Sequence, residues 1–244
     1  MIDRLRIMKF YKKTKKKIMK LIPHLTSKLR HSRDAHRAAR KYWSGCSCSL
    51  LASDPTYYDR QENVLRTRFM STIGSHGTAL DVGCGNGRFS MVISEWATKI
   101  DALDISPILI EEGKRVANEK KIKNINFDVI DLELGLPSKQ YELIACMGVM
   151  STLINEGPYL ALCKYLADSL NQGGWLILKD TLSLEPSGEL INTAEYTTHY
   201  RNIDMYLDVM KKHGFTMYDE VVMAEESNRI NKMYLMKKEE PKLH

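Results

Sequence analysis

The chain has 244 residues, of which 43% are hydrophobic and 27% charged, so it can form one domain with a substantial core and an appendage. No run approaches the ~18 apolar residues of a membrane span, and the basic N-terminus is not followed by the apolar core of a secretory signal. The five cysteines are an odd number, which disfavours a disulfide framework. These features predict a cytoplasmic protein with free thiols.

The positive charge is concentrated at the N-terminus. Residues 1–43 hold 15 Lys and Arg against two Asp, whereas the rest of the chain holds 21 basic and 28 acidic residues. Apolar residues recur there at steps of three and four between lysines, which predicts a basic amphipathic helix kinked near Pro23. Such a helix either lies on an anionic membrane surface through residues 1–30 or packs on the protein with its lysines in solvent. Nucleic acid is a disfavoured partner because no base-stacking motif accompanies the charge.

Beyond Trp43 the sequence alternates strand-like and helix-like runs, which predicts an α/β fold with a mainly parallel sheet and helices on both faces. The last two strand-like runs are joined too closely for a helix and are expected to form an antiparallel hairpin. The sequence therefore divides into a helical extension, residues 1–43, and a seven-stranded α/β domain, residues 44–244. The expected strands are Thr78–Val82, Lys99–Ile105, Asn124–Ile130, Tyr141–Met147, Trp175–Asp180, Phe215–Ala224 and Ile230–Lys237, and the expected helices lie around 87–97, 107–121, 156–170 and 201–213.

A glycine-rich run follows the first expected strand. In "ALDVGCGNGRFS", Gly83, Gly85 and Gly87 occupy alternate positions and Asp81 precedes them. Glycines between a strand and a helix let a ligand approach the backbone closely. The spacing differs from the G-x-G-x-x-G of dinucleotide-binding folds, and a carboxylate at Asp81 would repel a diphosphate but attract a cationic amine.

This run resembles motif I of the class I S-adenosylmethionine-dependent methyltransferases, and the resemblance extends over about residues 78–238. It implies a Rossmann-like sheet and S-adenosylmethionine as the cofactor. Asp104 would then bind the ribose hydroxyls, Asp131 the adenine amino group, and Arg88 the carboxylate of the methionine moiety. The resemblance implies these cofactor-binding residues: Asp81, Gly83, Gly85, Asn86, Gly87, Arg88, Asp104, Ile105, Asp131, Leu132 and Met147.

The acceptor side is less defined. Candidate catalytic groups are Asp180 at the expected end of strand five, and Tyr196, His199 and Arg201 ahead of the last helix. His199 is the preferred general base because it alone titrates near neutrality, although a helix-capping or surface role fits it as well. No pair of metal-binding acids is evident, so no metal is expected.

The sequence therefore predicts methyl transfer to oxygen or nitrogen of a small-molecule, glycan or lipid-linked acceptor, in the cytoplasm or peripherally at a membrane. Weaker local similarity to α-N-terminal protein methyltransferases, at Arg88 and near Tyr42 and Thr198, leaves protein N-methylation as an alternative. A non-catalytic scaffold that binds a polyanionic partner or a membrane through its basic arm is a second alternative. The acceptor and the oligomeric state remain open.

Overall fold

The computed structural model describes residues 34–47, 55–133, 135–193 and 195–239. Its main sheet confirms all seven expected strands, in the spatial order β3-β2-β1-β4-β5-β9-β8. The predicted kink near Pro23 and most of the basic extension lie outside the described residues. The strands are β1 (His76–Val82), β2 (Ala97–Asp104), β3 (Ile125–Val129), β4 (Tyr141–Met147), β5 (Leu170–Ser183), β8 (Phe215–Glu226) and β9 (Arg229–Lys238).

The first five strands run parallel, and β9 pairs antiparallel with both β5 and β8. Central strands are apolar on both faces because helices cover both. In β4, Leu143 and Ala145 pack into one core cluster while Ile144 and Cys146 pack into the other. This alternation follows from the two-residue period of a strand.

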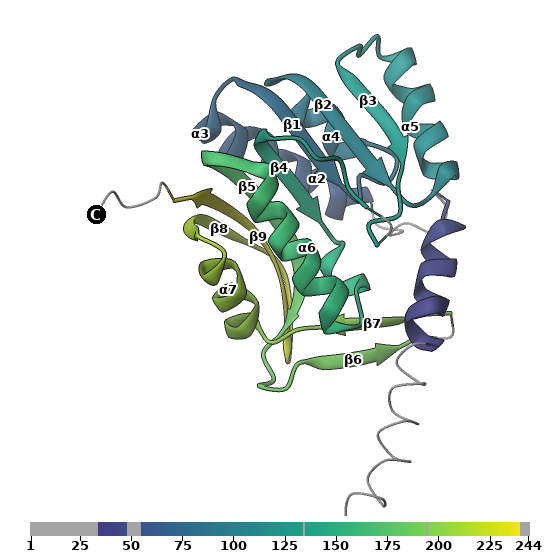
Figure 1. Ribbon diagram of the computed structural model, residues 1–244, viewed down its shortest axis with the longest axis vertical. Coiled ribbons are helices and arrows are strands. Elements are labelled where there is room, and N and C mark those ends of the chain that lie inside the picture. Colours follow the sequence, from purple (N-terminus) through teal and green to yellow (C-terminus); the bar gives the residue numbers. More distant parts are fainter. Residues whose placement is uncertain (1–33, 48–54, 134, 194, 240–244) are drawn as a thin grey trace, which may run out of the picture.

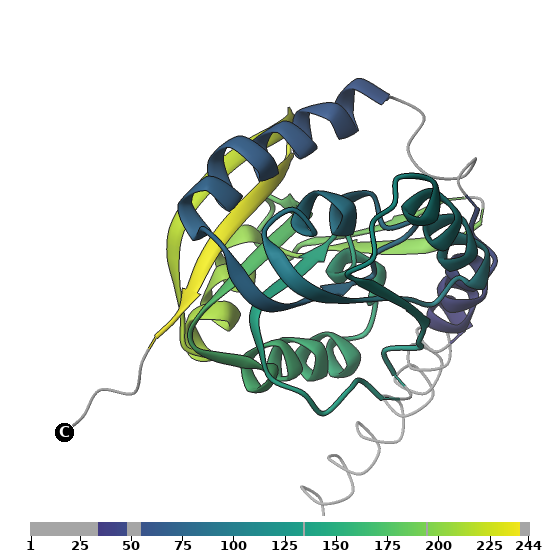
Figure 2. The same cartoon turned by 90° about the horizontal axis from the view of Figure 1, so that it is seen from above.

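Helices cover the two faces of the sheet in separate groups (Figures 1 and 2). The cluster on one face includes residues of α6 (Glu156–Ser169) and α7 (Ile203–Lys212). The cluster on the other includes residues of α4 (Arg88–Ile93), α5 (Pro107–Glu119) and η2 (Leu65–Met70). The π-helical η2 directly joins α2 (Pro55–Val64) to α3 (Ser71–Ile73). Ser106 caps the start of α5, because its Oγ accepts the N–H of Leu109 at 3.2 Å, and Pro107 occupies the first helical position.

A further helix spans residues 34–44 and crosses the expected boundary at residue 43. It is drawn in dark purple in Figure 1, beside α5 and the tips of β6 (Glu189–Asn192) and β7 (Thr197–Tyr200). Its aromatic residues contact the loop that leads into β7, since the ring of Tyr42 stacks on Tyr196 with centroids 4.4 Å apart. This part of the predicted extension is therefore packed against the domain.

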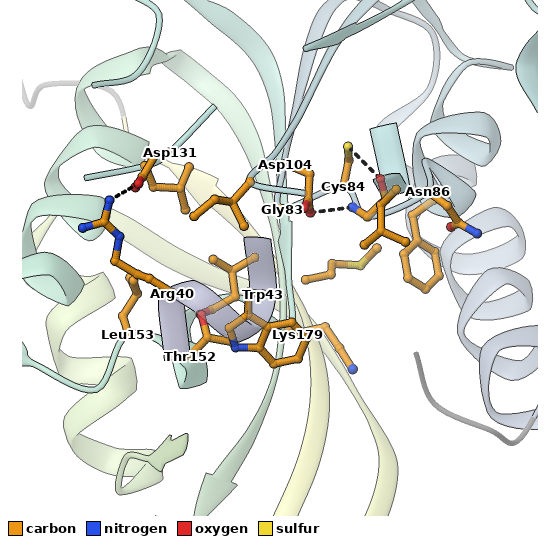
Figure 3. Close-up of a pocket in the computed structure, with 18 of the residues that line it drawn as sticks. Arg40, Trp43, Gly83, Cys84, Asn86, Asp104, Asp131, Thr152, Leu153 and Lys179 are labelled. Atoms are coloured by element: carbon orange, nitrogen blue, oxygen red, sulfur yellow. Dashed lines mark hydrogen bonds and ion pairs between the residues drawn. The ribbon is translucent and has the colours of Figure 1, made fainter. Parts of the chain in front are cut away.

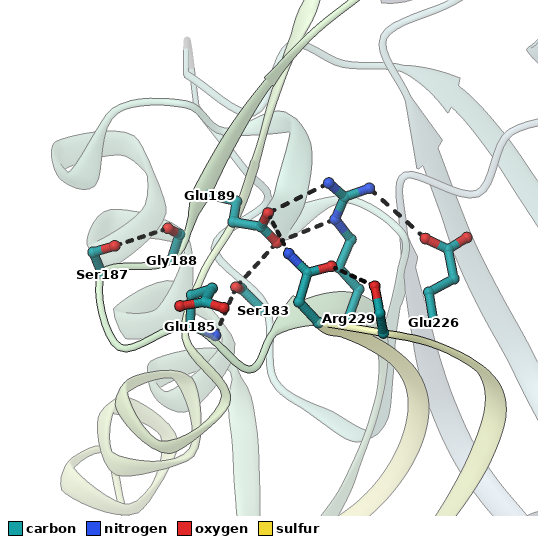
Figure 4. Close-up of polar contacts among 9 residues, drawn as sticks. Ser183, Glu185, Ser187, Gly188, Glu189, Glu226 and Arg229 are labelled. Atoms are coloured by element: carbon teal, nitrogen blue, oxygen red, sulfur yellow. Dashed lines mark hydrogen bonds and ion pairs between the residues drawn. The ribbon is translucent and has the colours of Figure 1, made fainter.

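The hairpin β6–β7 is an addition that the sequence did not predict. Its strands pair antiparallel as a separate two-stranded sheet between β5 and α7. Glu189 attaches it to the main sheet, as Figure 4 shows, by accepting hydrogen bonds from Ser183, Asn228 and Arg229 at 2.8–3.1 Å.

Strand five is longer than expected. β5 begins at Leu170, so residues 171–174, which lie between an expected helix and the expected strand, belong to the strand, where its pairing with β4 is irregular. β5 continues to Ser183, so Asp180 lies inside the strand and not at its end. The expected α6 and α7 are confirmed with small shifts at their ends.

Candidate functional site

A cavity of about 690 Å³ opens at the carboxyl ends of the parallel strands, where ligands bind in open α/β sheets. Figure 3 shows Asp131 and Asn86 on opposite sides of it, with Asp104 between them. The lining comes from the first five strands with the loops and helices that follow them, the helix over 34–44, α2, and β7 with the loop before it. It comprises His36, Arg40, Trp43, Tyr58, Gly83, Cys84, Gly85, Asn86, Arg88, Phe89, Asp104, Ile105, Leu109, Asp131, Leu132, Glu133, Met147, Gly148, Val149, Thr152, Leu153, Lys179, Tyr196 and Tyr200.

The glycine run forms the loop between β1 and α4. Gly83, Gly85 and Gly87 all have positive φ, at 68°, 56° and 74°, a region that costs little only for glycine. A Cβ on Gly83 would approach Val149 to 2.2 Å, and one on Gly87 would approach the Phe127 ring to 2.4 Å. A Cβ on Gly85 would meet nothing within 4 Å, because Gly85 faces the cavity.

Asp104 fixes this loop from the end of β2. Its Oδ2 accepts the N–H of Gly85 at 2.8 Å, and its Oδ1 accepts the N–H of Ser106 at 2.9 Å. Burial raises the pKa of the carboxyl, and the backbone hydrogen bonds oppose that rise. A carboxylate oxygen can accept two hydrogen bonds. Asp104 therefore retains capacity to accept a hydrogen bond from a ligand in the cavity. Its predicted ribose contact is compatible with this placement.

Asp131 lines the cavity beyond β3, as expected, but a cation already contacts it. Arg40 forms an ion pair with Asp131, and His36 of the same helix hydrogen bonds to Glu133. Figure 3 shows the guanidinium of Arg40 against Asp131. The sequence analysis missed His36, Arg40 and Trp43, because it assigned the segment to an extension. The nearest signal was that these residues lie beyond the lysine-rich stretch of residues 9–20.

Arg88 lies in the cavity wall but is held by α2. It forms ion pairs with Glu62 and, at 2.6 Å, with Asp59, and its guanidinium lies 5.1 Å from the centre of the Tyr58 ring. A ligand carboxylate, as expected from the resemblance, would share the guanidinium with these two side chains, since Glu62 and Asp59 contact Nε and Nη2.

Asp81 and Gly87 do not reach the cavity surface. Asp81 is 2% exposed, and its Oδ2 accepts the hydroxyl of Ser90 at 2.6 Å behind the loop. Burial raises the pKa of Asp81 to about 7. Its geometry supports the loop from below, in place of the direct contact with a ligand amine that the sequence suggested.

The four candidate catalytic residues are not brought together. Tyr196 lines the cavity, whereas Asp180, His199 and Arg201 do not. Arg201 donates to the carbonyls of Met150 and Leu153 at 2.9 and 2.8 Å, which is a structural arrangement.

His199 and Asp180 are likewise engaged within the fold. Nδ1 of His199 lies 3.1 Å from the carbonyl oxygen of Ile154, and burial lowers the pKa of the ring. Asp180 accepts the N–H of Ser151 at 3.3 Å and the hydroxyl of Tyr206 at 3.1 Å, and burial raises its pKa to about 6. This geometry therefore does not support a general-base role for His199.

The residues expected to bind S-adenosylmethionine lie along the cavity in the spatial order of the strands that carry them. From β3 through β2 and β1 to β4, the strand ends present Asp131 with Leu132, then Asp104, then the glycine loop, then Met147. This order agrees with the adenine and ribose contacts that the resemblance assigned to Asp131 and Asp104. The open space at Gly85 leaves room for the ligand beside the backbone.

In the described part of the chain, no three His, Cys, Asp or Glu side chains gather as metal ligands, and no helix is long and apolar enough to cross a membrane.

Comparison with known proteins agrees with this fit. A methyltransferase-domain family model matches residues 57–220. The aklanonic acid methyltransferase DauC of Streptomyces sp. is 34% identical over 99 residues, which are 39% of this chain and 44% of that protein. Malonyl-[acyl-carrier protein] O-methyltransferase 2 of Ilyobacter polytropus is 31% identical over 160 residues, 64% of this chain and 59% of that protein. The chain thus matches less than two thirds of the length of either relative.

The fold has solved counterparts. The N-methyltransferase NodS of Bradyrhizobium japonicum, in complex with S-adenosyl-L-homocysteine, superimposes with a TM-score of 0.63 over 84% of this chain and 99% of that one. The sequences are 15% identical, so this likeness concerns the fold.

Proposed function

The chain belongs to the S-adenosylmethionine-dependent methyltransferases, and from this premise we propose that it transfers a methyl group from S-adenosylmethionine to an oxygen of a small-molecule acceptor. The observation that carries the proposal is the glycine loop fixed by Asp104 beside an open cavity. We favour oxygen because the Ilyobacter polytropus relative, which matches a longer segment of this chain than DauC does, is named as an O-methyltransferase. Nitrogen remains the alternative, since the N-methyltransferase neighbour shares the fold alone.

Methyl transfer from S-adenosylmethionine requires mainly that the acceptor and the methyl group be positioned next to each other. The sulfonium of the cofactor supplies an already activated methyl group, so the protein has to align an acceptor with it and exclude water. We expect cavity residues from β4, β5 and β7 to hold the acceptor, and the glycine loop and Asp104 to hold the nucleoside end. The aromatic side chains Trp43, Tyr196 and Tyr200 would cover the acceptor side.

The test of cofactor binding uses two glycines in similar backbone conformations. Gly85 and Gly214 both have positive φ, and a Cβ on either would meet nothing within 4 Å, but only Gly85 lines the cavity. Alanine should therefore cause comparable backbone strain at both positions. We expect Gly85→Ala to weaken S-adenosyl-L-homocysteine binding in calorimetry and Gly214→Ala to leave it near the wild-type value.

Transfer itself is tested by incubating the protein with methyl-labelled S-adenosylmethionine and a heat-treated extract of host cells. The proposal expects enzyme-dependent label in small molecules. Absence of label from every fraction would contradict methyl transfer, even if the cofactor bound.

A further inference from the structure

Lys179 is the basic residue of the cavity wall for which the described part of the chain provides no carboxylate partner. Of the four basic side chains in the lining, His36, Arg40 and Arg88 each pair with an acidic residue. Within the described residues Lys179 forms no ion pair and no side-chain hydrogen bond, and its Nζ lies 5.3 Å from the centre of the Tyr57 ring. An enclosed ammonium without an acceptor is costly, so the site favours an anion supplied from outside the chain.

The position of Lys179 places that anion at the transfer end of the cavity. Lys179 pairs in register with Met147, the last residue of β4, and its carbonyl accepts the N–H of Gly148 at 2.6 Å. Asp131 and Asp104, which fit the nucleoside, follow strands on the far side of β1. Lys179 therefore faces the part of the cavity left to the acceptor (Figure 3).

A second donor in the wall lacks an acceptor. The indole N–H of Trp43 is buried and makes no hydrogen bond within the described residues, and its ring is part of the same lining. The candidate base His199 is absent from that lining and is engaged with the carbonyl of Ile154. The acceptor end thus offers donors, and it suits an oxygen that is already ionised and needs no base.

We propose that the acceptor carries a carboxylate, which Lys179 binds through one oxygen while the other oxygen attacks the methyl group. This inference rests on the proposed methyl transfer and specifies its substrate class. The step forms an O–CH₃ bond and breaks the S–CH₃ bond, whose electron pair remains on sulfur. It yields a methyl ester and S-adenosylhomocysteine, and no proton has to be removed. One lysine matches the single charge of a carboxylate, whereas a phosphate dianion would need more donors.

The surrounding titratable groups are compatible with a cationic Lys179. They are Tyr57 of α2, Asp180 of β5 and Tyr200 of β7. Burial lowers the pKa of the Lys179 ammonium, and the charge of Asp180 opposes this. Burial raises the pKa of Tyr57 to about 12, so this tyrosine stays neutral. A bound carboxylate would stabilise the ammonium further.

The test exploits the chemistry of methyl esters. Product made from labelled S-adenosylmethionine and heat-treated host extract is treated with mild alkali, which releases methanol from esters but leaves methyl ethers and methylamines intact. We expect volatile, alkali-labile label. Lys179→Met should lower it by about 10- to 100-fold, the scale of a lost hydrogen bond to a charged group. Lys179→Arg should retain a substantial part.

The matched control is Lys237→Met. Lys237 also lies over an aromatic ring, at 4.7 Å from the centre of Trp175, but it is exposed and outside the cavity. We expect wild-type ester formation from it. Binding of S-adenosyl-L-homocysteine and the melting temperature are measured for every variant, to show that the nucleoside site and the fold are intact.

The pH profile separates anion binding from base catalysis. If Lys179 binds a carboxylate as a cation, the rate falls as pH rises through its pKa, and Lys179→Arg removes that fall because arginine stays charged. A rate that rises through the same range would assign a general-base role and overturn the proposal.

Two further results would also overturn it. One is alkali-stable label, and the other is ester formation by Lys179→Met equal to that of Lys237→Met. Both leave the proposed methyl transfer standing. Absence of any label would instead remove the methyl transfer, and this inference with it.

Discussion

Two carboxylates near the cavity, Asp104 and Asp81, have different surroundings and therefore different structural roles. Asp104 faces the cavity and holds two backbone N–H groups, while Asp81 lies behind the loop against Ser90. The sequence placed both next to the ligand because each lies at the carboxyl end of one of two neighbouring parallel strands, β1 and β2. Burial depth distinguishes them, and burial of one side chain depends on packing from distant segments.

For Asp104, alanine should weaken S-adenosyl-L-homocysteine binding by about 1–3 kcal/mol, because it removes an acceptor and frees the Gly85 N–H. Asp101→Ala is the control on the same strand. Asp101 pairs with Lys139 and Tyr141 outside the cavity, so its loss should affect stability more than affinity. Equal affinities of the wild type and Asp104→Ala in calorimetry would place the nucleoside elsewhere.

For Asp81, the raised pKa predicts a pH-dependent stability. Between its ordinary value of 3.8 and about 7, the folded protein holds a proton that the unfolded chain has lost. The free energy of unfolding therefore falls as pH rises through this window and stays lowered above it. Asp81→Asn remains neutral, so its stability relative to wild type should increase from about pH 4 to about pH 7 in urea titrations.

Asp219→Asn is the matched control for Asp81→Asn. Arg68 lowers the pKa of Asp219, so that carboxylate contributes stability above its ordinary pKa and loses it as pH falls. The control should show no relative gain with rising pH. A flat difference between Asp81→Asn and wild type would mean that Asp81 is ionised in the folded protein throughout.

At the scale of elements, the helix over residues 34–44 lines the cavity from Asp131 to Tyr196. Arg40 reaches Asp131 across 91 residues of sequence, and Tyr42 and Trp43 contact Tyr196. Local patterns carry no information on such distant contacts. They did identify the strands of the main sheet, because these are long apolar runs bounded by turns. The short β6–β7 hairpin alternates weakly, with intermediate and exposed residues in β6, and gave no comparable signal.

This helix provides an optical test. Of the three tryptophans, Trp43 alone lines the cavity. Binding of S-adenosyl-L-homocysteine should therefore change the tryptophan emission of the wild type, and Trp43→Phe should abolish most of that change. Trp175→Phe, which removes a ring packed on Tyr218 at 4.9 Å, should preserve it. An unchanged response in Trp43→Phe would show that the helix does not cover the ligand.

At the scale of the whole molecule, the charge divides between a basic N-terminal segment and an acidic remainder. We propose that residues 1–33 attach the protein to anionic membranes, where each cation contributes on the order of 1 kcal/mol. In the structure the cavity wall already includes His36, so a deletion that tests membrane attachment alone has to end before this residue. A deletion that continues past His36 and Arg40 also removes cavity wall.

Two deletions separate these roles. Removal of residues 1–33 should abolish sedimentation with phosphatidylglycerol vesicles and leave S-adenosyl-L-homocysteine binding intact. Removal of residues 1–44 should weaken both. Neutral phosphatidylcholine vesicles serve as the control. Equal vesicle binding by the full chain and the shorter deletion would eliminate the membrane proposal.

The position of β9 between β5 and β8 in the sheet also determines the order in which strands can pair during translation. Residues Arg229–Lys238 leave the ribosome long after β5, so the nascent chain carries β5, and Lys179 within it, on an open sheet edge. An apolar, unpaired edge is prone to association with other chains. Chaperone binding during translation would therefore protect the strand that carries Lys179.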